Sequence, residues 1–168
     1  EGFAQLQYDH AAKVKPKSTW YRSKKNDRSS LNFNYVSCFL DDPLDDNLLW
    51  ISTKGGGLNL MDKRTGKFTH ITTQEGLCNN VVYGILADAD GNIWGSTNNG
   101  IFCLLKQRKD ENGSWLFRHF TKASGLQDDE FNTGAYAKLS NGDLAFGGVN
   151  GVNIFNPATV LQTGFTPN

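Results

Sequence analysis

The sequence predicts an all-β fold built from β-propeller blades, each a four-stranded antiparallel meander. The chain repeats itself at intervals of roughly 40 to 50 residues, a period typical of stacked or radial arrays of small structural units. Within each repeat, apolar and polar residues alternate over short segments, as in half-buried strands. Glycine is abundant, at 18 of 168 residues, and the 3.6-residue period of helical repeats is absent. We therefore expect a partial propeller of about three to four blades.

The first three strands of each repeat are marked by an asparagine, an aromatic residue and a glycine. The first segments begin at Asn34, Asn80 and Asn132. The second segments centre on Trp50, on Trp94 and, in the third copy, on Ala145 in place of the aromatic residue. Six positions after this central residue a glycine leads into a third apolar segment, at Gly56, Gly100 and Gly151. This regular spacing predicts three successive strands in each copy.

A fourth segment follows in two copies, at residues 68–72 and 117–121, and a Gly-Leu pair follows each of them. Phe3 to Tyr8 is interpreted as the fourth segment of an earlier copy. The predicted division of the single propeller segment 1–168 is the end of a preceding blade and a linker (1–29), a blade (30–77), a second blade (78–126), a final partial blade (127–160), and a tail or linker (161–168).

The connectivity of a meander places two kinds of loop on one face. Because successive strands run in opposite directions, the connection into each first strand lies beside the turns between second and third strands. Such loops are where a propeller offers side chains to a ligand, although asparagines also cap turns, and that alternative stays open. The predicted ligand-binding residues on this shared face are Asn34, Lys54, Asn80, Asn98, Asn132 and Asn150.

Charge and composition exclude several classes of function. The 17 basic and 17 acidic side chains cancel, which argues against nucleic acid or an anionic membrane as a partner. No apolar run approaches the ~20 residues needed to cross a bilayer. The three widely spaced cysteines, Cys38, Cys78 and Cys103, form no CxxC pair and are interpreted as packing thiols. We expect no metal site and no cofactor. Any export signal is expected to have been removed or to lie outside this segment.

Local motifs that could carry chemistry favour structural interpretations. Residues 88–92 resemble a calcium loop but are too short and lack its distal glutamate, so a polar turn is predicted. Residues 55–57 lack the Lys-Ser/Thr pair of a phosphate-binding loop. His70 and His119 share one repeat position, which favours a common structural role over catalysis. The two tryptophans of the second segments are predicted to pack between blades, with sugar stacking as the alternative. No catalytic residue is predicted.

The combined pattern resembles the two-component regulator propeller repeat. It reads N-x-V-x-x-[IF]-x-x-D, then [IL]-W-x-S-T, G-[GI]-[LF], F-x-H-[IF]-T and a closing Gly-Leu, and it covers nearly the whole chain from about Ser30 onward. Residues 130–135 together with 146–157 look like the final blade before the immunoglobulin-like domain of such sensors. Ala145 departs from the pattern, because the repeat has an aromatic residue there.

The resemblance implies a sensor function. Propellers of this family belong to the periplasmic sensors of hybrid histidine kinases, which often respond to oligosaccharides. It therefore implies a periplasmic, non-enzymatic segment whose kinase lies elsewhere in the full-length chain. The implied partners are an oligosaccharide and other blades or a β-sandwich domain of the same sensor, and self-association is also expected. Two alternatives stay open: a structural scaffold that binds protein, and a propeller lyase or hydrolase with acid and base groups at its mouth.

Overall fold

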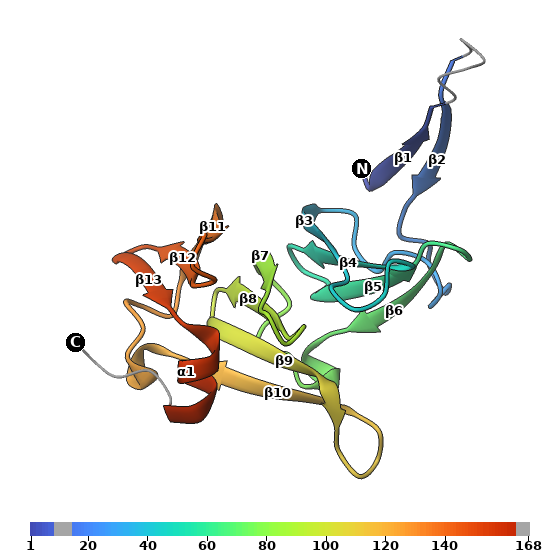
Figure 1. Cartoon of the computed structure of the whole chain (residues 1–168). Helices are drawn as coiled ribbons and strands as arrows, with labels where there is room; N and C mark the ends of the chain where they lie inside the picture. The colour runs from blue at the N-terminus through green and yellow to red at the C-terminus, as the bar shows by residue number, and fades with distance from the viewer. Residues whose placement is uncertain (9–14, 164–168) are drawn as a thin grey trace.

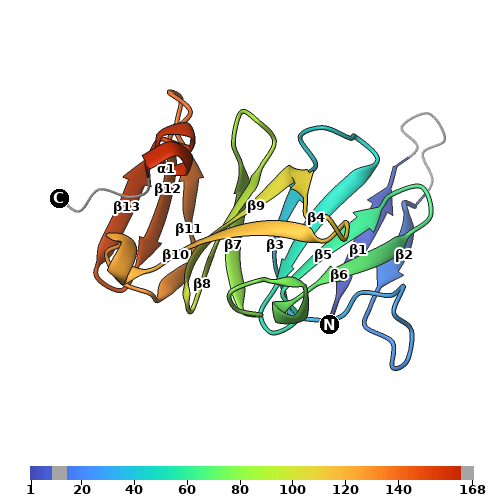
Figure 2. The ribbon, with the colours of Figure 1, turned by 90° about the horizontal axis from the view of Figure 1, so that it is seen from below.

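The computed structural model describes residues 1–8 and 15–163. Within them, strands form four antiparallel sheets that follow one another in chain order (Figures 1 and 2). The strands are β1 (Phe3–Gln7), β2 (Lys17–Tyr21), β3 (Val36–Asp41), β4 (Leu48–Thr53), β5 (Leu58–Asp62), β6 (Lys67–Ile71), β7 (Val82–Ala87), β8 (Ile93–Thr97), β9 (Gly100–Lys109), β10 (Trp115–Phe120), β11 (Phe131–Lys138), β12 (Leu144–Gly148) and β13 (Gly151–Phe155). The 3-10 helices η1 (Thr73–Glu75) and η2 (Lys122–Ser124) follow β6 and β10. The predicted all-β fold is confirmed.

The two complete blades are four-stranded meanders. Hydrogen bonding joins β3-β4-β5-β6 in one sheet and β7-β8-β9-β10 in the next, so each strand pairs with its neighbours in sequence. A third sheet holds β11-β12-β13, and the hairpin β1-β2 stands ahead of the first blade. The first strands β3, β7 and β11 lie next to one another (Figure 1). The sheets therefore fan out from one side, as blades do around a propeller axis.

The interpretation of Phe3 to Tyr8 as a fourth strand is wrong. Gly2 precedes β1 with a φ of 100°, as Gly57 precedes the third strand β5 with a φ of 70° and Gly100 begins the third strand β9 with a φ of 84°. A Cβ atom on any of these glycines would collide with the carbonyl oxygen at the end of the paired strand, at Tyr21, Ile71 and Phe120. β1 is thus a third strand and β2 the fourth. Alternating apolar residues do not distinguish the two positions, whereas the glycine in front does.

Tryptophans of the second strands form the cores between blades, as predicted. Trp50 is fully buried and belongs to a cluster with Ile85 and Phe102 of the following blade. Trp94 is buried in the same way among residues of the third sheet. Each indole N–H donates to a buried aspartate in the turn between first and second strands, Trp50 to Asp42 Oδ2 at 2.7 Å and Trp94 to Asp88 Oδ2 at 2.9 Å.

The third sheet lacks this pair. Leu139 N–H bonds to Asp143 O, as Asp88 N–H bonds to Asn92 O, so Leu139 replaces the aspartate while Ala145 replaces the tryptophan. Instead of a fourth strand, helix α1 (Pro157–Thr163) follows, and its Val160 is buried in the core around Trp94. The helix therefore runs across the boundary predicted after residue 160. No helix in the described part of the chain is long and apolar enough to span a membrane.

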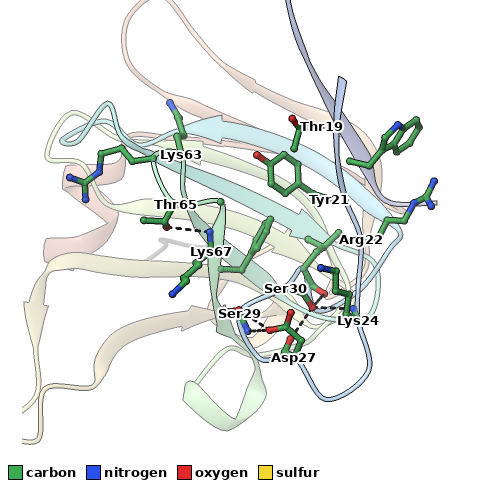
Figure 3. A pocket seen from close by; sticks show the side chains of 15 residues that line it. Thr19, Tyr21, Arg22, Lys24, Asp27, Ser29, Ser30, Lys63, Thr65 and Lys67 are labelled. Carbon is green, nitrogen blue, oxygen red and sulfur yellow. Dashed lines mark hydrogen bonds between the residues drawn. The ribbon is translucent and has the colours of Figure 1, made fainter. Parts of the chain in front are cut away.

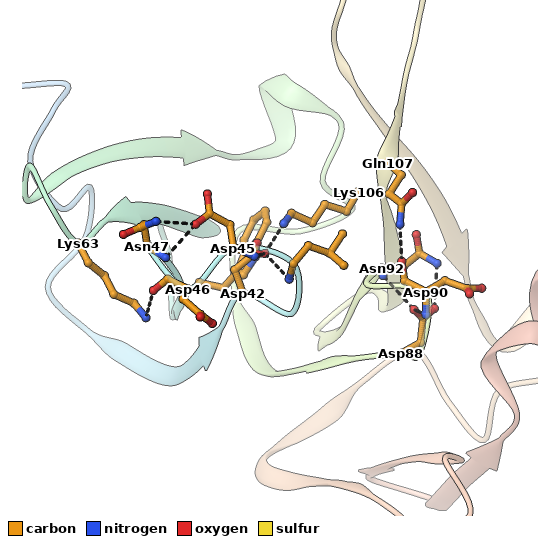
Figure 4. A network of polar contacts seen from close by, with 12 residues as sticks. Asp42, Asp45, Asp46, Asn47, Lys63, Asp88, Asp90, Asn92, Lys106 and Gln107 are labelled. Atoms are coloured by element: carbon orange, nitrogen blue, oxygen red, sulfur yellow. Dashed lines mark hydrogen bonds and ion pairs between the residues drawn. The ribbon is translucent and has the colours of Figure 1, made fainter.

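An ion pair connects the two complete blades on the side of the turns between first and second strands (Figure 4). Lys106 of β9 reaches Asp42 of the preceding blade, where the carboxylate is fully buried and the ammonium nearly so. Burial opposes ionisation of Asp42, but hydrogen bonds from Lys106, the Leu44 N–H and the Trp50 indole hold its pKa below the ordinary value. The contact ties one blade to the next by charge as well as by packing.

Candidate functional site

The turns between second and third strands lie against the starts of the next first strands, as the meander predicts. A repeated backbone hydrogen bond joins them: Gly2 N–H to Asn34 O at 3.0 Å, Gly57 N–H to Asn80 O at 2.8 Å, and Gly100 N–H to Asp129 O at 2.7 Å. Through this repeated hydrogen bond, loops of successive blades lie side by side and form one shared face. It also shows that Asn34, Asn80 and Asp129 are equivalent residues.

Asn34 and Asn80 use their side-chain oxygens within the protein. Oδ1 of Asn34 accepts a hydrogen bond from Ser23 N–H at 2.7 Å, and Oδ1 of Asn80 accepts one from Thr73 N–H at 2.9 Å. Both side chains are half-buried. They hold the connection between successive blades, so the structure supports the alternative in which these asparagines cap turns.

Asn132 is not the third member of this set. It lies inside β11, one residue after the first ladder pair, Phe131 with Gly148, whereas the other two asparagines stand two residues before the matching pairs of their blades. Its place is taken by Asp129, whose Oδ1 accepts the corresponding N–H bond at 2.6 Å. A carboxylate oxygen accepts the same hydrogen bond as an amide oxygen. Asn132 is exposed at the strand position that Tyr83 occupies one blade earlier.

The three turn residues differ in their surroundings. Asn98 is exposed, while the Asn150 amide donates to Asp128 Oδ2 at 2.6 Å. The ladders place Val149, not Asn150, at the position equivalent to Asn98. Asn150 therefore lies one residue further along its turn than Lys54 and Asn98 along theirs, and its side chain is held by the preceding connection.

Lys54 forms the centre of an aromatic cluster on the shared face. Its Nζ lies 5.0 Å from the ring centroid of Tyr35, in the same blade, and 5.7 Å from that of Tyr83, in the next blade. Its backbone N–H donates to Tyr35 O at 2.9 Å, which fixes the start of the side chain. Cation–π attraction at such distances favours this placement of the ammonium group. We call Tyr35, Lys54 and Tyr83 the lysine cage.

The charge of Glu130, which stands just before the third sheet, acts on Tyr83 of the lysine cage. Burial, followed by the negative charge of Glu130, raises the pKa of Tyr83, so its phenol stays protonated and can donate a hydrogen bond. Tyr35 and Glu130 are exposed. Three successive blades thus supply an ammonium group, two phenols and a carboxylate. Aromatic faces with such polar groups can bind the apolar face and the hydroxyl groups of a sugar ring.

Sequence reasoning found only Lys54 among these residues. Tyr35 and Glu130 each follow a residue of the equivalent set, Asn34 and Asp129, and Tyr83 stands three positions after Asn80. The positions that follow Asn34, Asn80 and Asp129 were thus the signal in the sequence that could have identified these residues. The approach of Tyr35 and Tyr83 to Lys54 depends on how one blade is placed against the next, which a repeat pattern does not contain.

The remaining candidates have structural roles. His70 Nε2 hydrogen-bonds with Ser30 O at 2.7 Å. Burial lowers the pKa of His119, and a hydrogen bond to the Gly76 backbone opposes that shift, so both histidines bind the connection into their own blade, as their shared position predicts. The third histidine, His10, lies outside the described residues. The Asp88 carboxylate closes its own turn through Asp90 N–H and Asn92 N–H, which confirms a polar turn at residues 88–92.

The cysteines and acidic residues offer no metal centre in residues 1–8 and 15–163, where no group of three or more ligand side chains converges. All three cysteines are free, with Cys38 and Cys103 buried and Cys78 half-buried. Burial raises the pKa of both Cys78 and Cys103, which keeps these thiols protonated. They pack in the blades as predicted.

These features define a class of protein, a run of β-propeller blades with a shared loop face. Residues 76–99 match the family described as two component regulator propeller. The predicted resemblance is therefore confirmed at these residues, which match one two-component regulator propeller repeat. No curated protein matches the chain.

Solved structures support the same conclusion. The chain is similar to the extracellular domain of BT4673 from B. thetaiotaomicron, assigned as a one component system in one crystal structure and as a hybrid two component system in another. Both comparisons give a TM-score of 0.66 and 25% identity, over 85% and 84% of this chain. The chain spans only 20% of that extracellular domain.

Two further similarities show the fold alone. The extracellular domain of BT3049, assigned as a hybrid two component system of B. thetaiotaomicron, gives a TM-score of 0.51 and 22% identity over 93% of this chain and 26% of its own. A protein of the same organism assigned as a phosphatase gives 0.57 and 13%, over 88% of this chain and 38% of its own.

Proposed function

We propose that this chain is part of the periplasmic sensor region of a hybrid two-component system histidine kinase and that it binds an oligosaccharide. The propeller repeat and the similarity to the extracellular domain of BT4673 support the sensor region. The segment itself is not an enzyme, and the kinase lies elsewhere in the full-length protein. Ligand on the shared face changes how neighbouring parts of the sensor are oriented.

The lysine cage is the observation that carries this proposal. Lys54 lies between tyrosines of two successive blades, and Glu130 of a third blade acts on Tyr83. Aromatic rings with both donors and an acceptor nearby are the features that sugar-binding sites use. A ligand held there touches several blades at once, so its binding energy depends on their relative placement.

We expect Lys54→Ala to weaken oligosaccharide binding by at least about tenfold, because a hydrogen bond to a charged group contributes about 1.5 to 3 kcal/mol. A glycan array with the intact ectodomain identifies the ligand, and calorimetric titration of that ligand measures the change. Lys25→Ala is the matched control, because Lys25 is an exposed lysine away from the lysine cage. Equal affinities of the Lys54 variant and the parent protein would contradict the assignment of this site.

The array also separates the alternatives. A scaffold that binds protein would bind no glycan, and its partner would be captured equally well by the Lys54 variant. A lyase or hydrolase would convert the bound glycan, which mass spectrometry of the eluted ligand detects. Both described histidines hydrogen-bond to the backbone of the connection into their own blade, which favours a structural role for them over catalysis.

We also propose that the outer face of the third sheet is covered by another blade or by a β-sandwich domain of the same sensor. Val152 and Ile154 of β13 are each 55% exposed there. Ile154 pairs with Ala145 as Cys103 pairs with Trp94, and in the second blade that face is buried under the next sheet. Exposed apolar sheet faces favour association.

The isolated segment is therefore expected to self-associate at micromolar concentration through this face. Replacing Val152 and Ile154 together by lysine should shift it towards monomer in sedimentation velocity, because two charges then oppose burial of the face. Leu6→Lys serves as a control, since Leu6 is equally exposed on the N-terminal hairpin. A parent segment that stays monomeric at these concentrations would rule the expectation out.

A further inference from the structure

A cavity separate from the lysine cage lies between the N-terminal hairpin and the outer strand of the first blade (Figure 3). It measures about 380 Å³. One wall comes from residues 19–31, which include the end of β2 and the connection after it, and the other from residues 63–68, which form the β5–β6 turn and the start of β6. We call it the basic pocket.

Cationic side chains dominate the lining of the basic pocket. The five cations are Arg22, Lys24, Lys63, Arg64 and Lys67, against a single lining carboxylate, Asp27. Figure 3 shows Arg22 and Lys24 on one wall and Lys63 and Lys67 on the other. A chain whose overall charge is zero thus concentrates positive charge at one cavity. Such a concentration attracts anions and costs self-repulsion in the empty protein.

Three of these cations have no carboxylate partner among the described residues. Lys63 pairs with Asp41, and Arg64 pairs with Asp62. Within residues 1–8 and 15–163, no acidic group lies within ion-pair distance of the other three lining cations, Arg22, Lys24 and Lys67. Their charges are therefore available to a ligand.

Asp27 is not within ion-pair distance of these three cations, and its carboxylate is oriented by its own turn. Oδ1 of Asp27 accepts hydrogen bonds from Ser29 N–H at 3.0 Å and from Ser29 Oγ at 2.7 Å. These bonds to Ser29 hold the pKa of Asp27 below its ordinary value. The aspartate fixes the loop that carries Lys24.

Aromatic rings give the basic pocket a surface for more than a bare anion. Tyr21 and Phe68 meet edge to face with centroids 5.8 Å apart, one from each wall. The Arg22 guanidinium lies 4.8 Å from the ring centroid of Trp20, which presents both groups together. Hydroxyl groups of Thr19, Ser29 and Thr65 complete the lining. Rings take the carbon face of a sugar, and the cations take its acidic groups.

We propose that the basic pocket binds an acidic oligosaccharide through its carboxylate or sulfate groups. Arg22, Lys24 and Lys67 hold the anionic groups, and Tyr21 and the exposed Trp20 contact the ring. The choice of an oligosaccharide rests on the proposed function, whereas the affinity for anions rests on the charges of the pocket alone. The two sites fail separately, because Lys54 lines only the lysine cage and Lys67 only the basic pocket.

Calorimetric titration of the full-length protein tests the proposal with four probes: tetragalacturonate, a heparin-derived tetrasaccharide, maltotetraose and inorganic sulfate. We expect at least one of the two acidic tetrasaccharides to bind more tightly than maltotetraose and sulfate, and the tighter of the two tells carboxylate from sulfate recognition. Its affinity should fall as salt is raised, since exposed charges are screened.

The double variant Lys24→Ala with Lys67→Ala should lose at least about tenfold in affinity for that tetrasaccharide, because two charge-assisted contacts are removed. Lys17→Ala with Lys25→Ala is the matched control, which removes the same charge from exposed positions outside the lining and should keep parent affinity. An unchanged melting temperature shows that both fold.

Equal losses of affinity in the two double variants would show that only the net charge of the protein matters, and they would overturn the proposal. Binding of maltotetraose or sulfate as tight as that of the acidic tetrasaccharides would also overturn it, as would no binding by either acidic probe. A loss caused by Lys54→Ala but not by the Lys24 and Lys67 variant would place acidic sugars in the lysine cage. That result would uphold the proposed function and reject the basic pocket.

Discussion

Trp94→Ala is expected to destabilise the protein by about 3 to 5 kcal/mol, the range measured when a buried aromatic side chain is cut to alanine. Trp94 is fully buried between the second and third sheets. Its ring stacks on Phe120 with centroids 5.7 Å apart and lies 5.1 Å from Phe155. The substitution leaves a cavity at the junction and removes the indole donor from the buried Asp88 carboxylate.

Denaturant and thermal unfolding measure this loss, and glycan titration below the melting temperature measures any separate effect on binding. Trp20→Ala is the matched control for stability, since Trp20 is 58% exposed and should cost little. A variant with an unchanged melting temperature and lost glycan binding would move Trp94 from the core to a binding site.

The third sheet shows how far this core can change without losing the blade. Leu139 and Ala145 stand where the other blades have aspartate and tryptophan. The two residues change together because either one alone leaves a buried polar atom without its partner. Sequence comparison of the repeats detected Ala145 as a departure, but the loss of its aspartate partner became clear only from the turn geometry.

The repeat pattern was sufficient for the strands of the two complete blades and for the buried tryptophans. It was insufficient where the same residue type occurs at positions that are not structurally equivalent. Asn132 is of the expected residue type but lies at another position, whereas Asp129 accepts the equivalent hydrogen bonds with a different side chain. The better signal was the spacing in the sequence from the preceding Gly-Leu pair. Gly76 stands four residues before Asn80, and Gly125 stands four residues before Asp129.

Contacts between segments far apart in the chain could not be predicted in the same way. The lysine cage needs Tyr83 of one blade beside Lys54 of another, and the basic pocket needs the connection after β2 beside the β5–β6 turn. Each depends on the rotation between neighbouring sheets. Exposed positions such as Tyr35 and Lys67 also carry no periodic signal, since their identity is not constrained by burial.

Asp42→Ala is the second substitution expected to have a large effect, about 3 to 5 kcal/mol, because it leaves a buried charge without its partner. The Lys106 side chain is only 11% exposed, and Asp42 is its carboxylate partner. The same carboxylate accepts the Trp50 indole N–H at 2.7 Å and the N–H groups of Leu44 and Asp45. One truncation thus removes the acceptor of several buried donors.

A double-mutant cycle with Lys106→Met separates the charge from the hydrogen bonds. If the ion pair carries much of the effect, the double variant should be more stable than Asp42→Ala alone, because the unpaired ammonium is gone. Equal stability of the single and double variants would show that the ammonium reaches solvent and that the loss comes from the Trp50 indole and the turn.

The same carboxylate predicts how stability depends on pH. The pKa of Asp42 is lower in the folded protein than its ordinary value of 3.8, so its ionised form stabilises the fold at pH values above 3.8, and this contribution is lost as pH falls through the folded pKa. The difference in unfolding free energy between the parent protein and Asp42→Ala should therefore be constant near neutral pH and shrink below about pH 4. Urea unfolding at pH 7, 5 and 3 measures it. A difference that stays constant down to pH 3 would mean that the pKa of Asp42 is the same in the folded and the unfolded protein, and it would contradict this prediction.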